Sequence, residues 1–189
     1  MLQRGLIAGF WGARPNDTCE TTAVPAAAAV AAGAAPPPAV PQVTPGMVLT
    51  AMQRVGLPSL HVHTQPEDKT LVNFDTIFYA DPTAVTRDLT LLGQSVRIEA
   101  TPRSFTWHYG DGTSATTTEP GAPYPAKDVV HRYTDAHVTV RTSVDVTYSG
   151  RFQVAGGPWQ AIPGTVTIAG PPDALRISEA TPVLSGDYS

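Results

Sequence analysis

Cysteine and charge are scarce in this chain. There is one cysteine, Cys19, and only 15% of the residues are charged. A lone cysteine cannot form a disulfide within the chain, which leaves a free thiol, a bridge to another chain, or a partner lost from a truncated N-terminus. The 12 basic residues are outnumbered by 16 acidic ones, and the sequence pI is about 5.6. This balance argues against nucleic-acid binding, because nucleic-acid-binding surfaces carry a basic patch.

Sequence patterns of membrane proteins and of common enzymes are also missing. No run of about 18 apolar residues occurs, so we expect no integral membrane segment. The chain has no G-x-S-x-G motif, no H-E-x-x-H motif and no phosphate-binding loop. Its carboxylates are scattered through turn-like segments instead of being paired on rigid elements. We therefore expect no catalytic residues, no cofactor and no enzymatic activity.

Proline and glycine, by contrast, are abundant, with 19 and 16 residues. Many of the prolines lie in the uncharged segment 24–45, VPAAAAVAAGAAPPPAVPQVTP. Alanine favours helix, but the repeated prolines break it. We therefore predict that residues 1–45 are an N-terminal segment that is mostly disordered and includes an Ala/Pro-rich spacer, partly in polyproline II conformation. Residues 46–189 are predicted to form a single folded body.

The first residues bear on localisation. Residues 1–13, MLQRGLIAGFWGA, contain one positive charge, Arg4, and a short apolar run interrupted by glycine. They resemble a weak signal peptide that lacks a cleavage site of the A-x-A type. Alternatively, the true start lies upstream and the export signal is missing from the assigned one. On either interpretation we expect an extracellular or cell-surface protein.

A single helix is predicted at the start of the body. Thr44 suits the N-cap and Pro45 the first turn of a helix over residues 45–55. Its apolar stripe consists of Val48, Met52 and Val55. This stripe is expected to pack on the rest of the body.

From Leu60 onward the apolar residues recur at every second position, which is typical of strands. One strand is predicted over residues 71–79, with Val72, Phe74, Thr76 and Phe78 on one face. Two further strands, over 96–100 and 105–109, are separated by a predicted turn at 101–104. The remaining strands are predicted at 137–148, 152–155, 159–162, 165–169 and 175–177. Seven or eight short strands with one helix predict a mainly β protein, an antiparallel β-sandwich.

The segment 105–146 resembles a PKD domain, which is an Ig-like β-sandwich. The residues that carry the resemblance are Trp107, Tyr109, Gly110, Asp111 and Gly112 in W-H-Y-G-D-G-T, and His131 and Tyr133 in H-R-Y. PKD domains show W-x-F-G-D-G-T/S followed by H-x-Y and by a strand of alternating β-branched residues. The resemblance implies a PKD-like core over about residues 94–148. It also implies that Trp107 packs between the sheets and that Tyr133 lies near the corner between them.

Three further segments, 70–79, 120–125 and 156–159, resemble a group of small actinobacterial exported proteins that contain a PKD domain and are mostly uncharacterised. This resemblance implies an extracytoplasmic, non-catalytic module and implies no known activity.

Aromatic residues near the predicted turns are the candidate binding residues. Trp159, Tyr124 and Tyr148 would form an exposed sandwich edge that binds a glycan or a protein, since aromatic faces give a large contact area. The alternative is that Trp159 only caps the sandwich.

Metal-ligating residues are few. His61 and His63 form H-x-H on a predicted strand and would share one face, as in some zinc sites. Asp111 is a weak calcium candidate, and its alternative role is to form a turn. A metal site needs three or four converging ligands, so we predict none.

The sequence thus predicts a non-catalytic extracytoplasmic interaction module that binds an envelope protein or a polysaccharide. Two alternatives stay open. One is a structural assembly subunit of a surface complex, and the other is a metal-dependent hydrolase that uses His61 and His63. The identity of the partner, the membrane attachment and the oligomeric state are left open by the sequence.

Overall fold

Two long paired strands, β5 and β8, form the frame of the body. The computed structural model describes residues 41–181, in which there are eleven strands and one helix. These are α1 (Pro45–Arg54), β1 (His63–Gln65), β2 (Lys69–Leu71), β3 (Thr76–Tyr79), β4 (Val85–Leu91), β5 (Gln94–His108), β6 (Ser114–Thr117), β7 (Val130–His131), β8 (Thr139–Val154), β9 (Gln160–Ala161), β10 (Val166–Ile168) and β11 (Asp173–Ser178). The leader-like residues, Cys19 and most of the predicted spacer lie outside the described residues.

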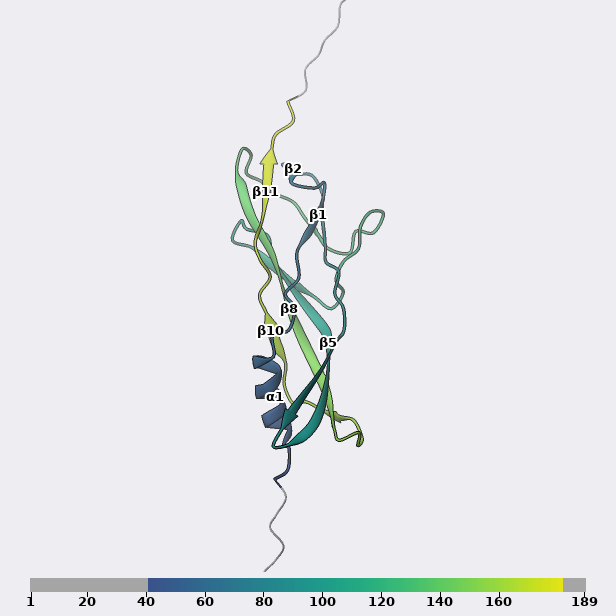
Figure 1. The fold of residues 1–189 in the computed structure, drawn as a ribbon. Helices are drawn as coiled ribbons and strands as arrows, with labels where there is room; N and C mark the ends of the chain where they lie inside the picture. The colour runs from purple at the N-terminus through teal and green to yellow at the C-terminus, as the bar shows by residue number, and fades with distance from the viewer. Residues whose placement is uncertain (1–40, 182–189) are drawn as a thin grey trace, which may run out of the picture. The chain divides into compact units, whose positions relative to one another are not determined.

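The strands form two sheets. An eight-stranded sheet has the order β2-β11-β8-β5-β4, with β6 paired to β5 and with β9 and β10 paired to β8. A three-stranded sheet has the order β1-β3-β7. All pairs are antiparallel except β2 with β11. Figure 1 shows β5 and β8 side by side, with α1 at one end of the body and β1 and β2 at the other. The predicted mainly β class is confirmed, and the arrangement is consistent with a β-sandwich.

The core lies on one face of the β5–β8 pair. Even-numbered residues of β8 from Val140 to Phe152 point inward, apart from Gly150, which has no side chain. Near one end of this face Phe78 on β3 packs edge-on against Trp107, with the ring centroids 6.5 Å apart. Toward the other end α1 covers it, and a Cβ on Gly150 would lie 3.0 Å from Met52 Sδ. Glycine at this position therefore lets the helix approach the sheet.

The predicted turn at residues 101–104 is wrong, because β5 runs straight through it as one strand of 15 residues. The register with β8 shifts there: Pro102 lies opposite Tyr148, whereas Ser104 lies opposite Thr147. Arg103 is thus an extra residue, a β-bulge that moves the inward face from even to odd numbers. The inward residues are Val96, Ile98 and Ala100 before the bulge, and Phe105 and Trp107 after it. In the sequence, the change from even-numbered to odd-numbered apolar residues suggests a boundary between two strands, but in the structure it marks a bulge within one strand.

The predicted strand over 71–79 is also divided. The structure has two strands there, β2 and β3, which belong to different sheets. Asn73 between them has φ 58°, and its N–H donates to the carbonyl of Tyr133 at 2.8 Å. The alternation breaks at this turn, so Phe74 is 51% exposed instead of sharing a buried face with Phe78.

The β8 strand differs from its prediction at both ends. It begins at Thr139, because His137 has φ 62°, and Val138 is consequently exposed. It continues to Val154, so the segments predicted as two strands, 137–148 and 152–155, are one. After Val154 the chain turns at Ala155 and Gly156, with the N–H of Gly157 donating to the carbonyl of Val154 at 2.8 Å, and leads to β9.

The helix is close to its prediction. Thr44 caps it, with its Oγ1 accepting a hydrogen bond from the N–H of Met47, and Val48 and Met52 are buried. Val55 is exposed, since the helix ends at Arg54 and Gly56, with φ 74°, turns the chain away. Between residues 41 and 181 no helix is both long and apolar enough to cross a membrane.

Strand β4 has no counterpart among the predicted elements. Its inward residues Val85, Leu89 and Leu91 alternate correctly, but Arg87 occupies an inward position, opposite the buried Ile98 of β5. This charge interrupts the apolar pattern in the sequence. Because β4 ends the strand order of the described sheet, Arg87 lies on an edge strand, where an inward charge disfavours pairing with another chain.

We expect Trp107→Ala to lower the free energy of unfolding by about 3–5 kcal/mol, as for other large buried aromatics. Trp107 is fully buried, and its Nε1–H donates to Thr117 Oγ1 at 2.9 Å. Trp159→Ala is the matched control, since Trp159 is 39% exposed, and should cost less than about 1 kcal/mol. Urea denaturation measures both variants. An unchanged transition in Trp107→Ala would contradict the core assignment.

We expect Arg87→Val to increase self-association, because it removes the inward charge from the edge strand. Thr86→Val is the control, as Thr86 is exposed on the other face of β4. Light scattering at increasing protein concentration measures the mass. If both variants keep the wild-type mass at every concentration, Arg87 does not protect the edge.

Candidate functional site

The body has an open groove of about 1120 Å³. Its walls come from β1 and β3 of the smaller sheet and from the first half of β11 in the larger one. Buried side chains at its base include Val62, Ile77 and Leu175. The groove therefore lies between the two sheets, next to the buried core.

Exposed aromatic side chains lie along this groove. Tyr124 is 71% exposed and Phe74 is 51% exposed, and both line it. The backbone N–H of Tyr124 donates to Gln65 Oε1 at 2.6 Å, which ties the Tyr124 loop to β1. Tyr79 stacks on His63, with 5.1 Å between the ring centroids. The groove thus displays aromatic surface on a backbone that hydrogen bonds hold in place.

A carboxylate with two cationic partners lies on the same lining. Asp75 accepts hydrogen bonds from Lys127 Nζ at 2.9 Å and from Arg132 Nε at 2.6 Å. These bonds, first that of Lys127 and then that of Arg132, hold the pKa of Asp75 below its usual value. Both cations of the lining are therefore engaged by one carboxylate.

The rest of the charge in the groove is acidic. Besides Asp75, the lining contains Glu67, Asp68 and Asp173. Four carboxylates against two cations, Lys127 and Arg132, give a formal charge of 2 − 4 = −2 when histidine is neutral. The groove therefore favours neutral or cationic groups over anionic ones.

The two histidines of the H-x-H motif line the groove, but the structure gives them different partners. His61 Nδ1 lies 3.7 Å from Asp173 Oδ2, whereas His63 Nε2 lies 3.5 Å from Asp81 Oδ2. Over residues 41–181 no three His, Cys, Asp or Glu side chains come together in a way that could hold a metal ion. The described part of the chain thus offers no support for a metal centre at His61 and His63.

The residues of the PKD-like motif lie together at the far end of β5. His131 stacks on Tyr109, with 4.0 Å between the centroids and 5° between the ring planes. Tyr133 donates its hydroxyl hydrogen to the carbonyl oxygen of Tyr109 at 2.9 Å, and burial raises its pKa. A Cβ on Gly110 would lie 2.5 Å from the carbonyl oxygen of Arg141, so only glycine fits there. The conformation at Gly110, with φ 81°, also favours glycine.

Asp111 serves the turn and the neighbouring histidine. Its Oδ1 accepts from the N–H and the hydroxyl of Thr113, at 2.9 and 2.6 Å, and its Oδ2 lies 2.6 Å from His131 Nε2. Burial opposes the ionisation of Asp111, but the hydrogen bonds outweigh it and the pKa is lowered. Both carboxylate oxygens are engaged within the protein, which supports a role in the turn.

Tyr148 and Trp159 do not join Tyr124 in a shared surface. Tyr148 is fully buried and donates its hydroxyl to the carbonyl oxygen of Pro58 at 3.0 Å, so its assignment as a binding residue is wrong. Trp159 lies beside the far end of β8, under the guanidinium of Arg151 at 4.7 Å from the ring centroid. The groove touches β8 nine residues before Arg151, at Thr142, which is about 30 Å along a strand. Of the three, only Tyr124 lines the groove.

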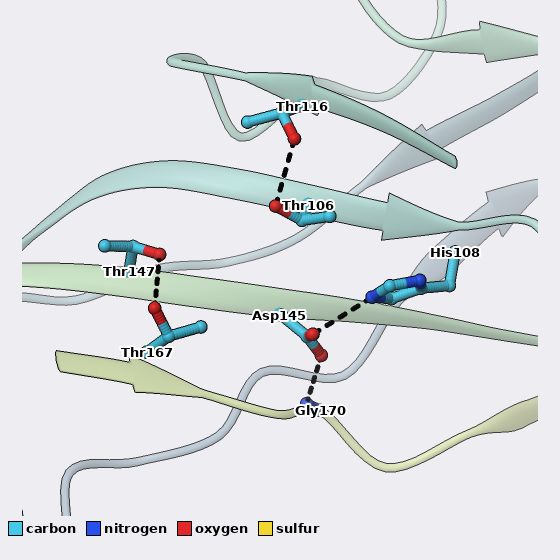
Figure 2. Close-up of polar contacts among 7 residues, drawn as sticks. All are labelled: Thr106, His108, Thr116, Asp145, Thr147, Thr167 and Gly170. Carbon is cyan, nitrogen blue, oxygen red and sulfur yellow. Dashed lines mark hydrogen bonds and ion pairs between the residues drawn. The ribbon is translucent and has the colours of Figure 1, made fainter.

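The outer face of the larger sheet carries cross-strand hydroxyl pairs (Figure 2). Thr106 on β5 and Thr116 on β6 have their Oγ1 atoms 3.1 Å apart, and those of Thr147 on β8 and Thr167 on β10 are 2.9 Å apart. Such pairs stabilise a sheet by about 0.2–1 kcal/mol each. These hydroxyls bond to one another, so the face needs no ligand to satisfy them.

A second contact on this face joins β5, β8 and the segment after β10. Asp145 Oδ2 lies 3.0 Å from His108 Nε2, and Asp145 Oδ1 accepts from the N–H of Gly170 at 3.3 Å (Figure 2). Asp145 thus links three neighbouring segments. This role explains a polar pair in the middle of a strand face without invoking a ligand.

Comparison with protein-family models, with curated proteins and with solved structures finds no match to this chain. The functional argument therefore rests on the geometry of the groove.

Most of the groove residues were missed by sequence reasoning. Asn73 and Asp75 fell within a predicted strand, and Lys127 lies in a long connection without a recognisable pattern. Arg132 was seen only as the middle residue of H-R-Y. Tyr124 carried a signal, because an aromatic residue between two prolines marks an exposed turn, and His61 and His63 carried one as H-x-H on a predicted strand. The groove joins segments more than a hundred residues apart, and no local pattern reports such proximity.

The lowered pKa of Asp111 predicts a loss of stability in acid. A carboxylate whose pKa is lower in the folded state stabilises the fold above its unfolded pKa of about 3.9 and loses this contribution as the pH falls through the folded value. We expect Asp111→Asn to lower the melting temperature at pH 7. Between about pH 5 and pH 2 the variant should lose less stability than the wild type, measured by thermal denaturation at each pH. Parallel curves for the two proteins would contradict the assignment.

Proposed function

We propose that this chain is a non-catalytic extracytoplasmic interaction module with a PKD-like, Ig-type sandwich body. Its groove binds a component of the cell envelope, either a protein or a polysaccharide. The observation that carries the proposal is an open groove of about 1120 Å³ with exposed Tyr124 and Phe74 along it. Ligand sites are concave, combining aromatic surface with a few placed polar groups, and this groove has both.

The polar groups of the groove support binding. Gln65 and Asp75 hold the backbone or side chains of the lining itself, at 2.6 to 2.9 Å. His61 and His63 each lie beside a separate carboxylate. These contacts fix the lining in place and leave the exposed aromatic faces of Tyr124 and Phe74 available for contact with sugar rings or apolar side chains.

The PKD-like part of the proposal is supported by the motif residues. Trp107 is fully buried between β5 and β3, and the hydroxyl of Tyr133 reaches back to Tyr109. The resemblance implies a Trp107 packed between the sheets and a Tyr133 near the corner between them, and these contacts support that expectation. Together with the sandwich-like sheets, they favour an Ig-type body.

The alternative of an assembly subunit would need strand edges that pair between copies. The inward Arg87 on β4 disfavours such pairing at that edge. The mass of the full chain in solution distinguishes the two functions, because a binding module is expected to be monomeric at low concentration. Fractionation with N-terminal sequencing tests the proposed location outside the cytoplasm.

We expect Tyr124→Ala to weaken binding of the full chain to isolated envelope material by about tenfold, since aromatic anchors carry much of the energy of an interface. Trp159→Ala is the matched control, as it removes an exposed aromatic side chain that does not line the groove. A sedimentation assay with purified cell-wall polysaccharide and with envelope protein measures both. Equal loss in the two variants, or loss only in Trp159→Ala, would contradict the groove as the binding site.

A further inference from the structure

Two strand edges face the groove without a partner strand among residues 41–181. β1 pairs only with β3. β11 pairs with β8 from Asp173 to Arg176, but with β2 only from Arg176 onward. The first half of β11 and all of β1 therefore present open edges, and both edges line the groove.

The alternating hydrogen-bond pattern of the antiparallel pairs shows which backbone groups point to each open edge. In an antiparallel pair, directly opposite residues both point their N–H and C=O groups either toward each other or away. The N–H of Phe78 points to Val129, away from β1. Thr64 lies directly opposite Phe78, so the N–H and C=O groups of Thr64 also point away from β3, to the open edge of β1. On β11 the N–H of Arg176 points to Asp68, away from β8. Ala174 lies two residues earlier on the same strand, so its N–H also points away from β8, to the open edge.

We propose that the groove takes up an extended segment of a partner protein that adds as a strand to one of these edges, at Ala174 or at Thr64. This inference rests on the proposed function and names the partner of the same groove. Strand addition uses main-chain hydrogen bonds for affinity, while alternate side chains give specificity. Apolar side chains of the added strand would contact the exposed rings of Phe74 and Tyr124, which line the same groove.

The charge of the lining specifies the partner further. Asp75 and its two cations together carry +1, and Glu67, Asp68 and Asp173 carry −3, so the lining keeps a net acidic charge beside the two edges. Glu67 and Asp68 are exposed, and Asp173 has only an exposed histidine, His61, as its neighbour at 3.7 Å. The added segment therefore carries apolar residues alternating with lysine or arginine.

A pair of substitutions at Ala174 tests the hydrogen bonds. Ala174→Pro removes the outward N–H without removing a β11–β8 bond, and proline is tolerated on edge strands in this orientation. Ala174→Val keeps the N–H and adds a side chain at an exposed position. Thr64→Pro makes the same change on β1. The melting temperature of each variant of the full chain is measured first, and only variants that keep the wild-type transition are used.

The probe is a short synthetic peptide that alternates valine with lysine, with binding followed by fluorescence anisotropy. We expect Ala174→Pro or Thr64→Pro to weaken its binding by about tenfold, the size expected for lost main-chain hydrogen bonds, and Ala174→Val to leave it unchanged. Protection of the Ala174 or Thr64 amide from hydrogen exchange on binding supports the same edge. Unchanged affinity in both proline variants overturns the proposal.

Further measurements distinguish a basic peptide from the other possible ligands of the groove, which are an acidic peptide, a polysaccharide and a second copy of the chain. The same peptide with glutamate in place of lysine should bind at least about tenfold more weakly, and equal binding overturns the charge assignment. If polysaccharide binds in a Tyr124-dependent way and the peptide does not, strand addition is overturned while the proposed function stands. If Ala174→Pro instead abolishes dimerisation of the chain alone, the occupant is a second copy and the proposal of a separate partner falls. If neither peptide nor envelope material binds, both proposals fail.

Discussion

The pairing of β5 with β8 is the constraint on which the rest of the structure depends. These strands are the longest in the body, and every other strand of the larger sheet attaches to one of them or to a strand that does. Because side chains alternate with period two, a single misplaced residue would turn half of the core outward. The bulge at Arg103 places Val96 and Trp107, whose numbers differ in parity, on the same inward face.

That inward face is longer than either layer that covers it. The three-stranded sheet packs on it through Phe78, and α1 packs on it through Met52 beside Gly150. The groove lies between β1 and the start of β11, and its lining includes buried residues such as Leu175. The candidate site is thus a consequence of how two short elements share the inner surface of one long sheet.

The polar groups of the outer face and those of the groove differ in how many remain free to bind a ligand. On the outer face of the sheet, Thr106 pairs with Thr116, and Asp145 bonds with both His108 and Gly170. In the groove, Asp75 holds two cations in place, but Glu67 and Asp68 have exposed carboxylates. This difference is why the groove, and not the more regular outer face, is the better candidate for recognition.

The amino-acid sequence alone determined the elements whose cause is local. The helix cap at Thr44 and the glycine turn at Gly110 both follow from residue chemistry within a few positions. Tertiary structure alone decided whether a break in the pattern is a turn, as at Asn73, or a bulge, as at Arg103, because only the facing strand sets the register. It also decided that Tyr148 is buried while Tyr124 lines the groove: burial depends on segments far away in the chain, which no local pattern encodes.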